Sequence, residues 1–347
     1  MEKKLEVKNL VVSFRTQAGK VQAVRDISFD LYKGETLAIV GESGSGKSVT
    51  ATSILRLLDR NGEIEKGKIL FKEKEESEPI DLTKLSLKDM QRVRGNRISM
   101  IFQEPMTALN PVFTIKRQLC EPFIYHQKMN KKQAKKQALE MVKLVQIANA
   151  ERVLEDYPHT LSGGMRQRVM IAMALSCKPK LLIADEPTTA LDVTVQAQIL
   201  DLMRALKQEQ NTAILFITHD LGVVREMADD VAVMYLGEAV ELCDKNTLFG
   251  GSRYLHPYTE GLMRSIPSAR KRRAKLPCIE GNVPHPLHFP KGCKFASRCR
   301  YATPRCLQKL PELAEVETGH FIRCYYPQKY ARRTRAHKEK ELEKNAD

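Results

Sequence analysis

The sequence predicts an α/β fold in which a mainly parallel sheet carries helices on both faces, followed by a smaller cysteine-rich region. Between residues 36 and 218, short apolar strands alternate with helical segments, and this order favours a parallel sheet covered on both faces. A glycine-rich loop joins one of these strands to a helix. Five of the eight cysteines lie in the last quarter of the 347-residue chain, where the alternation ends.

The expected elements follow the chain in order. Residues 5–14 and 21–31 alternate between apolar and polar side chains and predict two strands of an antiparallel β arm. From about 112 to 160 the periodicity is helical and predicts an insert that interrupts the sheet. Further strands are expected at 36–40, 67–71, 97–102, 180–185, 213–218, 231–235 and 238–242, and further helices at 47–58, 163–175 and 193–208.

Charge and hydropathy restrict the location and the partners. The 57 Lys and Arg residues exceed the 42 Asp and Glu residues by 15, which favours a nucleotide, a nucleic acid or an acidic lipid surface as partner, or simply a solvated basic surface. The basic stretches are not interleaved with aromatic residues, so nucleic acid is not expected. No apolar run is long enough to cross a bilayer, and the first residues do not resemble a secretory signal. We therefore expect a cytoplasmic protein that needs other chains for any work across a membrane.

The loop at residues 41–48, GESGSGKS, fits the phosphate-binding pattern G-x-x-x-x-G-K-[ST] and lies between a predicted strand and a predicted helix, as that motif requires. Its glycines allow backbone N–H groups to point at an anion, and the helix N-terminus adds partial positive charge. A glycine-rich turn could match by chance, but the flanking elements argue against that interpretation. Lys47 is expected at the β- and γ-phosphates and Ser48 on Mg²⁺. The expected nucleotide contacts of this segment are Gly41, Ser43, Gly44, Ser45, Gly46, Lys47, Ser48 and Val49.

An acidic pair ends the apolar run at 180–185. Asp185 and Glu186 are therefore expected at the carboxyl edge of the sheet, where the ligands of open α/β sheets gather. Asp185 would hold Mg²⁺ and Glu186 would polarise the attacking water. The alternative, an acidic helix cap, is weakened by the presence of the phosphate loop.

Ser162, Gly163 and Gly164 open the helix before that strand. Ser162 is a suitable N-cap, but two glycines in a first turn cost helix stability, about 1 kcal/mol each relative to alanine. They are understandable if exposed N–H groups must approach a phosphate.

The segments GESGSGKS, LSGGMRQR, LLIADEPTTALD and FITHD, in this order, resemble the nucleotide-binding subunit of an ABC transporter over residues 5–250. The resemblance implies a P-loop ATPase that hydrolyses ATP with Mg²⁺ and uses Glu186, His219 and Gln103 as catalytic residues. By position it also implies that Gln103 contacts Mg²⁺ and water, that His219 contacts the γ-phosphate and that Asp192 crosses a dimer interface. Phe14 matches the aromatic residue that stacks on adenine, although it could instead be a core residue of its strand.

The resemblance implies partners as well. One phosphate loop and one LSGGM segment per chain imply a head-to-tail pair, in which residues 162–164 of one subunit close over the ATP held by the other. The second subunit is expected to be homologous but different. Two integral permease subunits and an extracytoplasmic substrate-binding protein would complete the transporter, with this chain at the cytoplasmic face of the membrane.

The late cysteines form a constellation of their own: Cys293, Cys299, Cys306 and Cys324. In a cytoplasmic chain such crowding favours metal ligation over disulfides. The two-residue spacing of zinc knuckles is absent, so a [4Fe–4S] cluster fits better, with zinc as the second choice and metal-free thiols as the third.

Together with HPYT at 256–259, these cysteines are similar to the C-terminal extension of oligopeptide and dipeptide importer ATPases, some of which carry an iron–sulfur cluster there. The resemblance implies an ATPase that powers the import of short peptides. A nickel or other small-solute importer is the alternative, followed by a soluble ABC ATPase. The expected parts are a nucleotide-binding domain at 1–250 with a helical subdomain at about 104–165, a C-terminal domain at 251–330 and a charged tail at 331–347.

Overall fold

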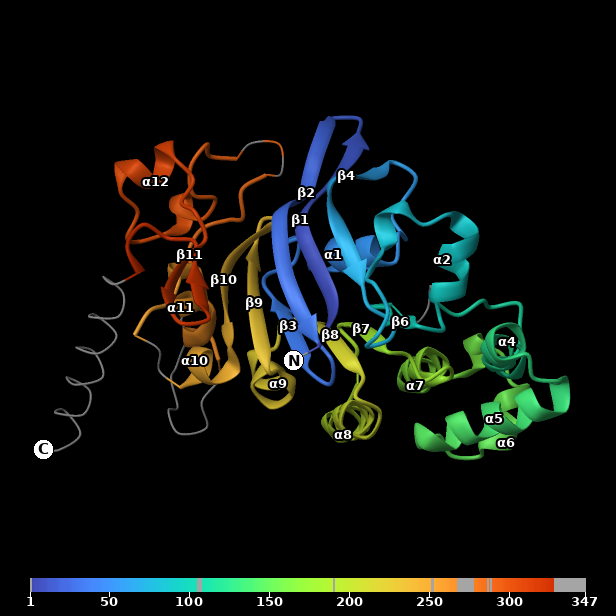
Figure 1. The fold of residues 1–347 in the computed structure, drawn as a ribbon. Helices are drawn as coiled ribbons and strands as arrows, with labels where there is room; N and C mark the ends of the chain where they lie inside the picture. Colours follow the sequence, from blue (N-terminus) through green and yellow to red (C-terminus); the bar gives the residue numbers. More distant parts are fainter. Residues whose placement is uncertain are drawn as a thin grey trace, which may run out of the picture.

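The computed structural model describes residues 2–104, 108–189, 191–250, 253–266, 278–285, 287 and 289–327. This part of the chain contains two sheets with helices around them (Figure 1). The larger sheet has eight strands in the order β11-β12-β10-β9-β3-β8-β7-β6, and the smaller has four in the order β2-β1-β4-β5.

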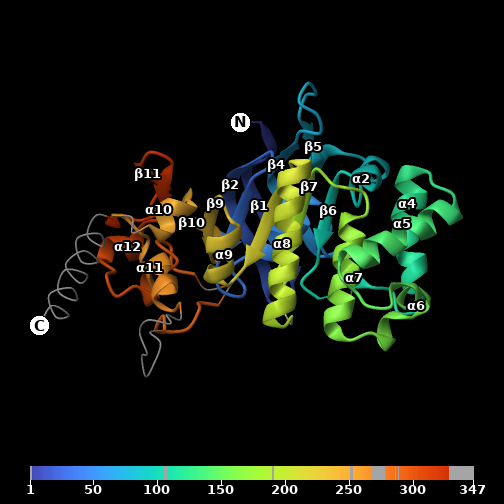
Figure 2. The same cartoon turned by 90° about the horizontal axis from the view of Figure 1, so that it is seen from below.

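The centre of the larger sheet is parallel and buried on both faces. Every residue is buried in β3 (Thr36–Val40), β7 (Leu181–Asp185) and β8 (Ala213–Thr218), a pattern typical of strands covered by helices on both sides. β6 (Ile98–Ile101) and β9 (Asp230–Tyr235) extend the parallel sheet on either side. α1 (Lys47–Ile54) packs on one face, and α8 (Val193–Gln210) and α9 (Leu221–Met227) pack on the other. Figure 2 shows α8 lying across its face of the sheet.

The antiparallel arm is confirmed. β1 (Lys3–Thr16) and β2 (Gly19–Tyr32) form a long hairpin, and β4 (Gly62–Phe71) pairs with the other edge of β1. β4 begins at Gly62 rather than at the expected residue 67. Apolar side chains of the arm share one buried cluster with α1 and the larger sheet. Short elements complete this part of the chain: β5 (Ile80–Asp81), η1 (Leu82–Lys84) and α2 (Leu87–Val93).

Helices fill the expected insert: α4 (Ile115–Gln127), α5 (Lys131–Leu144), α6 (Ala150–Glu155), η2 (Pro158–Thr160) and α7 (Gly163–Leu175). Polar side chains cap the starts of α4, α5 and α7, because the first N–H groups of a helix lack partners within it. Thr114 accepts a hydrogen bond from the backbone N–H of Arg117, and Asn130 and Gln133 form a reciprocal capping box. In Figure 1 this helical group lies beyond β6, away from the C-terminal strands.

The described C-terminal residues extend the larger sheet. β10 (Glu238–Asp244) returns antiparallel to β9, and β12 (His320–Ile322) pairs with β10 and with β11 (Ala314–Glu317). β11 and β12 were not predicted from the sequence. The helical elements between β10 and β11 are α10 (Lys245–Phe249), α11 (Pro257–Arg264), η3 (Ala296–Arg298) and α12 (Pro304–Gln308).

A set of buried polar residues connects these strands by hydrogen bonds. His320 Nε2 lies 2.8 Å from Glu241 Oε1, and the backbone N–H of His256 donates to Glu241 Oε2 at 2.8 Å. All three residues are at most 1% exposed. Burial lowers the pKa of His256 to about 3, so its imidazole is neutral at ordinary pH.

Within the described residues, no helix is both long and apolar enough to cross a membrane. The predicted charged tail at 331–347 lies outside the residues that the structure describes. The division into two domains near residue 250 stays a prediction.

Candidate functional site

The predicted phosphate loop joins β3 to α1 at the carboxyl edge of the larger sheet. Two of its glycines are required by close contacts. A Cβ at Gly41 would lie 2.2 Å from the carbonyl oxygen of Met234, and one at Gly46, where φ is +95°, would lie 2.4 Å from the carbonyl oxygen of Ala23. The loop is thus pressed against β2 and β9, and only residues without a side chain fit at these two points.

Lys47 lies inside this loop. Its Nζ donates hydrogen bonds to the carbonyl oxygens of Gly41, at 2.8 Å, and Glu42, at 2.9 Å. The side chain is buried, and burial lowers the pKa of the ammonium group, although Glu186, Asp185 and Glu42 favour its charged form. The charge is therefore positioned to exchange carbonyl oxygens for phosphate oxygens.

Asp185 ends β7 beside the loop and is 3% exposed. Burial raises the pKa of its carboxyl group to about 6, and the nearby Glu186 adds to this rise, whereas a hydrogen bond from Ser48 and the charge of Lys47 oppose it. Asp185 Oδ1 has no hydrogen-bond partner among the described residues. A buried carboxylate oxygen without a partner, next to a serine hydroxyl, fits the oxygen ligands that Mg²⁺ requires.

Glu186 is the centre of a hydrogen-bond network. Its Oε1 lies 3.1 Å from His219 Nδ1, and its Oε2 accepts hydrogen bonds from Gln103 Nε2 at 3.3 Å and Thr189 Oγ1 at 3.1 Å. Glu186 has φ +47°, a conformation that a non-glycine residue adopts only when its surroundings enforce it. The structure thus brings together the three residues expected to be catalytic.

A cavity of about 330 Å³ lies above the phosphate loop. Gln103 and Glu186 reach it, and so do Phe14 from β1 and Leu236 from the β9–β10 turn. Phe289 also lines it and was not predicted, because nothing in its local sequence distinguishes it from a core residue. Arg25 lies over the Phe289 ring at 4.0 Å from the centroid. The loop residues at the cavity are Ser43, Gly44, Ser45, Gly46, Lys47, Ser48 and Val49.

The segment Ser162–Gly164 is not part of this cavity. Ser162 caps α7 by accepting a hydrogen bond from the backbone N–H of Met165, and Asp192 caps α8 in the same way through Val195. A Cβ at Gly163 would meet no other atom of the described chain within 4 Å. The packing of the described chain therefore does not explain why this position is glycine.

The four late cysteines gather in one region. The pKa of Cys293 is raised to about 12, mainly by burial and further by the proximity of Cys324, Cys299 and Cys306. Among the described residues, one set of three metal-ligating side chains has all its ligand atoms within 4.8 Å, and it comprises Glu241, Cys243 and His320.

The set around Glu241 is explained without a metal ion. Both of its carboxylate oxygens already accept hydrogen bonds, from His320 and from the backbone of His256. Burial also raises the pKa of the Cys243 thiol, which disfavours the thiolate that a metal would need. We interpret this group as a structural anchor of the C-terminal strands.

Comparison with known families gives two matches along the chain. The family described as "ABC transporter" matches residues 24–189, and the "Oligopeptide/dipeptide transporter, C-terminal region" matches residues 240–306. The first match contains the phosphate loop and the acidic pair. The second contains three of the four late cysteines.

Full-length relatives agree with both matches. The chain is 52% identical over 322 residues to the oligopeptide transport ATP-binding protein AppD of Bacillus subtilis, covering 92% of this chain and 96% of the relative. It is 50% identical over 326 residues to the dipeptide transport ATP-binding protein DppD of the same organism, covering 94% and 95%.

Solved structures with the same fold include the ATP-binding cassette MJ0796 in a dimeric post-hydrolysis state with ADP and Pi. Its TM-score is 0.62 at 27% identity, covering 70% of this chain and 98% of that one. A second is cbiO1 from Clostridium perfringens, with a TM-score of 0.57 at 26% identity, covering 72% and 92%.

Proposed function

Because this chain belongs to the ABC transporter family and, within it, to the ATP-binding subunits of oligopeptide and dipeptide transporters, we propose that it hydrolyses ATP to power the uptake of short peptides across the cytoplasmic membrane. The observation that carries the proposal is the network of Gln103, Glu186 and His219 beside the phosphate loop. An ATPase needs a charged cradle and a positioned water, and the surroundings of the loop supply groups for both.

The site residues have separate roles in ATP hydrolysis. Backbone N–H groups of the loop and the Lys47 ammonium bind the phosphates, and the ring of Phe14 packs against the base. Ser48, Asp185 and Gln103 would hold Mg²⁺, which neutralises charge on the phosphates when it is bound. Glu186 orients and polarises the attacking water, and His219 both positions Glu186 and contacts the γ-phosphoryl group.

A second subunit completes the site. The first turn of α7 has a capped start, and its Gly163 leaves open space rather than a packing contact. We place this turn against the ATP of a homologous partner, with Asp192 at the same interface, because N–H groups at a helix N-terminus bind phosphate. The dimeric state of the related MJ0796 structure supports this arrangement. The partner is a different ATPase chain.

The complete transporter contains, besides the two ATPases, two integral permease subunits and an extracytoplasmic substrate-binding protein. This chain lies at the cytoplasmic face, bound to the permeases. The relatives named as peptide transport ATP-binding proteins support short peptides as cargo.

We further propose that Cys293, Cys299, Cys306 and Cys324 hold a [4Fe–4S] cluster in a small C-terminal domain. The four thiols lie close enough to influence one another, and their spacing in the sequence lacks the two-residue interval that is usual at zinc sites. Anaerobically purified protein should contain four iron and four sulfide per chain, a ratio expected from the cluster composition. Stoichiometric zinc without sulfide would support the second choice.

The test of the ATPase assignment is Glu186→Gln in the transporter assembled with its permeases and partner ATPase. MgATP binding should be retained while turnover falls about 100-fold or more, because the water loses its base. Glu209→Gln, an exposed change on α8, is the matched control. Near-normal turnover in Glu186→Gln would refute the assignment.

In proteoliposomes, ATP-dependent accumulation of a labelled dipeptide or oligopeptide tests the cargo, and accumulation of nickel instead would favour the alternative importer.

A further inference from the structure

The phosphate loop is held from outside the ATPase core, by residues near the end of the chain. The backbone N–H of Glu42 donates to the hydroxyl of Tyr258 at 2.7 Å, across 216 residues of sequence. The Glu42 carboxylate receives both terminal nitrogens of Arg298, with Nη1 to Oε2 at 2.6 Å and Nη2 to Oε1 at 3.1 Å. Backbone and side chain of one loop residue are therefore both fixed by the C-terminal region.

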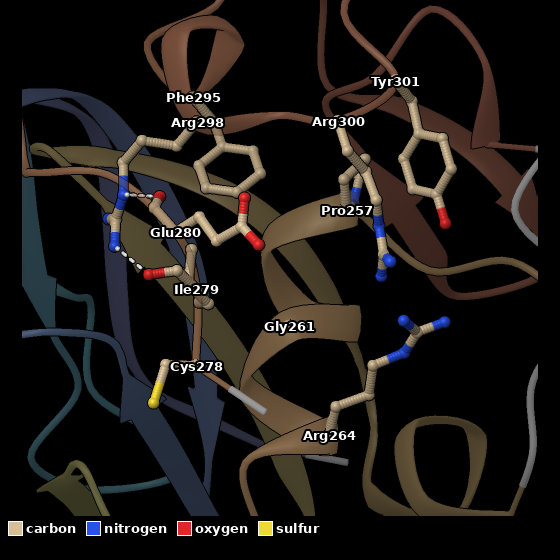
Figure 3. A pocket seen from close by; sticks show the side chains of 10 residues that line it. All are labelled: Pro257, Gly261, Arg264, Cys278, Ile279, Glu280, Phe295, Arg298, Arg300 and Tyr301. Carbon is tan, nitrogen blue, oxygen red and sulfur yellow. Dashed lines mark hydrogen bonds between the residues drawn. The ribbon is translucent and has the colours of Figure 1, made fainter. Parts of the chain in front are cut away.

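Arg298 is itself rigidly placed. Its side chain is 5% exposed, and its nitrogens also reach the Tyr235 hydroxyl at 3.4 Å and the carbonyl oxygens of Glu280 at 3.2 Å and Ile279 at 3.5 Å. Figure 3 shows the last two of these bonds and the Phe295 ring beside the Arg298 stem. A planar guanidinium with this many acceptors keeps one orientation, which suits it to a bidentate contact with a carboxylate.

An aromatic cluster supports both contacts. The rings of Tyr235 and Tyr258 are 4.7 Å apart between centroids, and Phe295 lies 5.3 Å from Tyr235 and 5.5 Å from Tyr258. Tyr235 belongs to β9, Tyr258 to α11, and Phe295 precedes η3. The cluster joins the sheet to the segment that carries Arg298, so the contacts of Tyr258 and Arg298 with Glu42 are coupled to each other.

Glu42 in turn positions the groups that meet the nucleotide. Its carbonyl oxygen accepts hydrogen bonds from Lys47 Nζ at 2.9 Å and from the backbone N–H of Ser45 at 3.2 Å. A shift of Glu42 would therefore move the Lys47 ammonium and an N–H group of the loop at the same time. Phosphate binding by such a loop depends on prearranged N–H groups.

We propose that Arg298 and Tyr258 are positioning residues of the nucleotide site, which hold the phosphate loop in its binding conformation through Glu42. The proposal rests on ATP binding at this loop and adds that the C-terminal region sets the affinity. Attachment of that region to the core has its own anchors, since β12 pairs with β10 and His320 meets Glu241. The contacts with Glu42 are thus available for a role beyond attachment.

The test measures MgADP binding to the full-length chain by calorimetry, which avoids turnover. Arg298→Ala should weaken binding about tenfold or more, and Arg298→Lys should recover only part of the loss because an ammonium cannot make both hydrogen bonds. Tyr258→Phe, which removes one hydroxyl, should weaken binding several-fold. Arg300→Ala is the matched control: Arg300 and Arg298 both line a pocket of the C-terminal region, but Arg300 lies on the other side of it in Figure 3 and contacts Glu260 at 3.7 Å.

A double-mutant cycle separates positioning from general loss of structure. If Arg298 acts through Glu42, the variants Glu42→Ala and Glu42→Ala/Arg298→Ala should bind MgADP with nearly the same affinity. Binding within twofold of wild type in both Arg298→Ala and Tyr258→Phe, or fully additive losses in the cycle, would overturn the inference. Failure of the wild-type chain to bind MgADP would overturn the proposed function itself, so the two failures are distinguishable.

Discussion

Gly163 offers a test that separates folding from function. A Cβ at this position would meet nothing of the described chain within 4 Å, and the residue lies in the first turn of α7. Alanine is a better helix former than glycine by about 1 kcal/mol in a helix interior, so Gly163→Ala at the start of α7 should stabilise the chain by a fraction of this amount. For a protein of this size we expect a rise in Tm of about 1–3 °C.

The same substitution should reduce turnover. A methyl group on this turn would hold the phosphate of the partner's ATP away from the N–H groups of α7. Loss of one hydrogen bond to a charged group costs about 1.5–3 kcal/mol, which corresponds to roughly a 10- to 150-fold fall in kcat.

The assay compares thermal unfolding of the isolated chain with steady-state ATPase activity of the assembled transporter. Gln137→Ala, an exposed change within α5, controls for a small gain in helix propensity. Full activity would show that the glycine does not serve a partner site, and a clear fall in Tm would show that the fold itself requires the glycine. The expected pattern, a more stable and less active variant, cannot arise from damage to the fold.

Three further predictions concern the site and its anchors. The pKa of Asp185 is about 6 in the folded chain and 3.8 ordinarily, so the free energy of unfolding should fall as pH rises from about 4 to about 6 and stay low above it. Asp185→Asn should lack this pH dependence and should have a free energy of unfolding that is higher by on the order of 3 kcal/mol at pH 7 without Mg²⁺. The same variant should lose Mg²⁺-dependent nucleotide binding. If Asp185→Asn kept the wild-type pH dependence of the free energy of unfolding, Asp185 would not be the group that titrates in this range. His320→Ala should lower the free energy of unfolding by about 1–3 kcal/mol and expose the C-terminal strands to limited proteolysis, unlike the exposed control His159→Ala, because one buried carboxylate oxygen of Glu241 loses its hydrogen-bond partner. Phe289→Ala should weaken MgATP binding about threefold to tenfold, as expected for loss of one aromatic wall, whereas equal affinity would show that the ring does not meet the nucleotide.

The parts of the fold and site that are local in sequence could be predicted. β3, β7 and β8 are continuous apolar runs bounded by polar residues, so their position and burial follow from composition. The phosphate loop and the acidic pair lie at the ends of those runs, and parallel strands bring their carboxyl ends to one edge. Proximity of Asp185 to the loop was therefore predictable without coordinates.

Contacts that depend on distant segments could not be predicted. β12 is three residues long and finds its partner β10 almost 80 residues earlier in the chain, with no alternating pattern to mark it. Arg298 is one of many arginines, and only the fold shows that it faces Glu42. Tyr258 lies in a recognisable HPYT segment, yet its hydroxyl contact with the loop depends on the packing of α11 against β9.

The cavity at the phosphate loop connects the C-terminal region with the proposed nucleotide site. The cavity is lined by residues from the arm, the loop, the strand ends and Phe289, so part of its wall comes from the C-terminal region. Arg298 and Tyr258 contact the same loop through their hydrogen bonds with Glu42. The proposed positioning role of Arg298, which directly precedes Cys299, predicts that a change in the structure of the cysteine-bearing segment is transmitted to the loop through these contacts. Coupling of this kind needs no large movement, because a buried bidentate pair is either formed or broken.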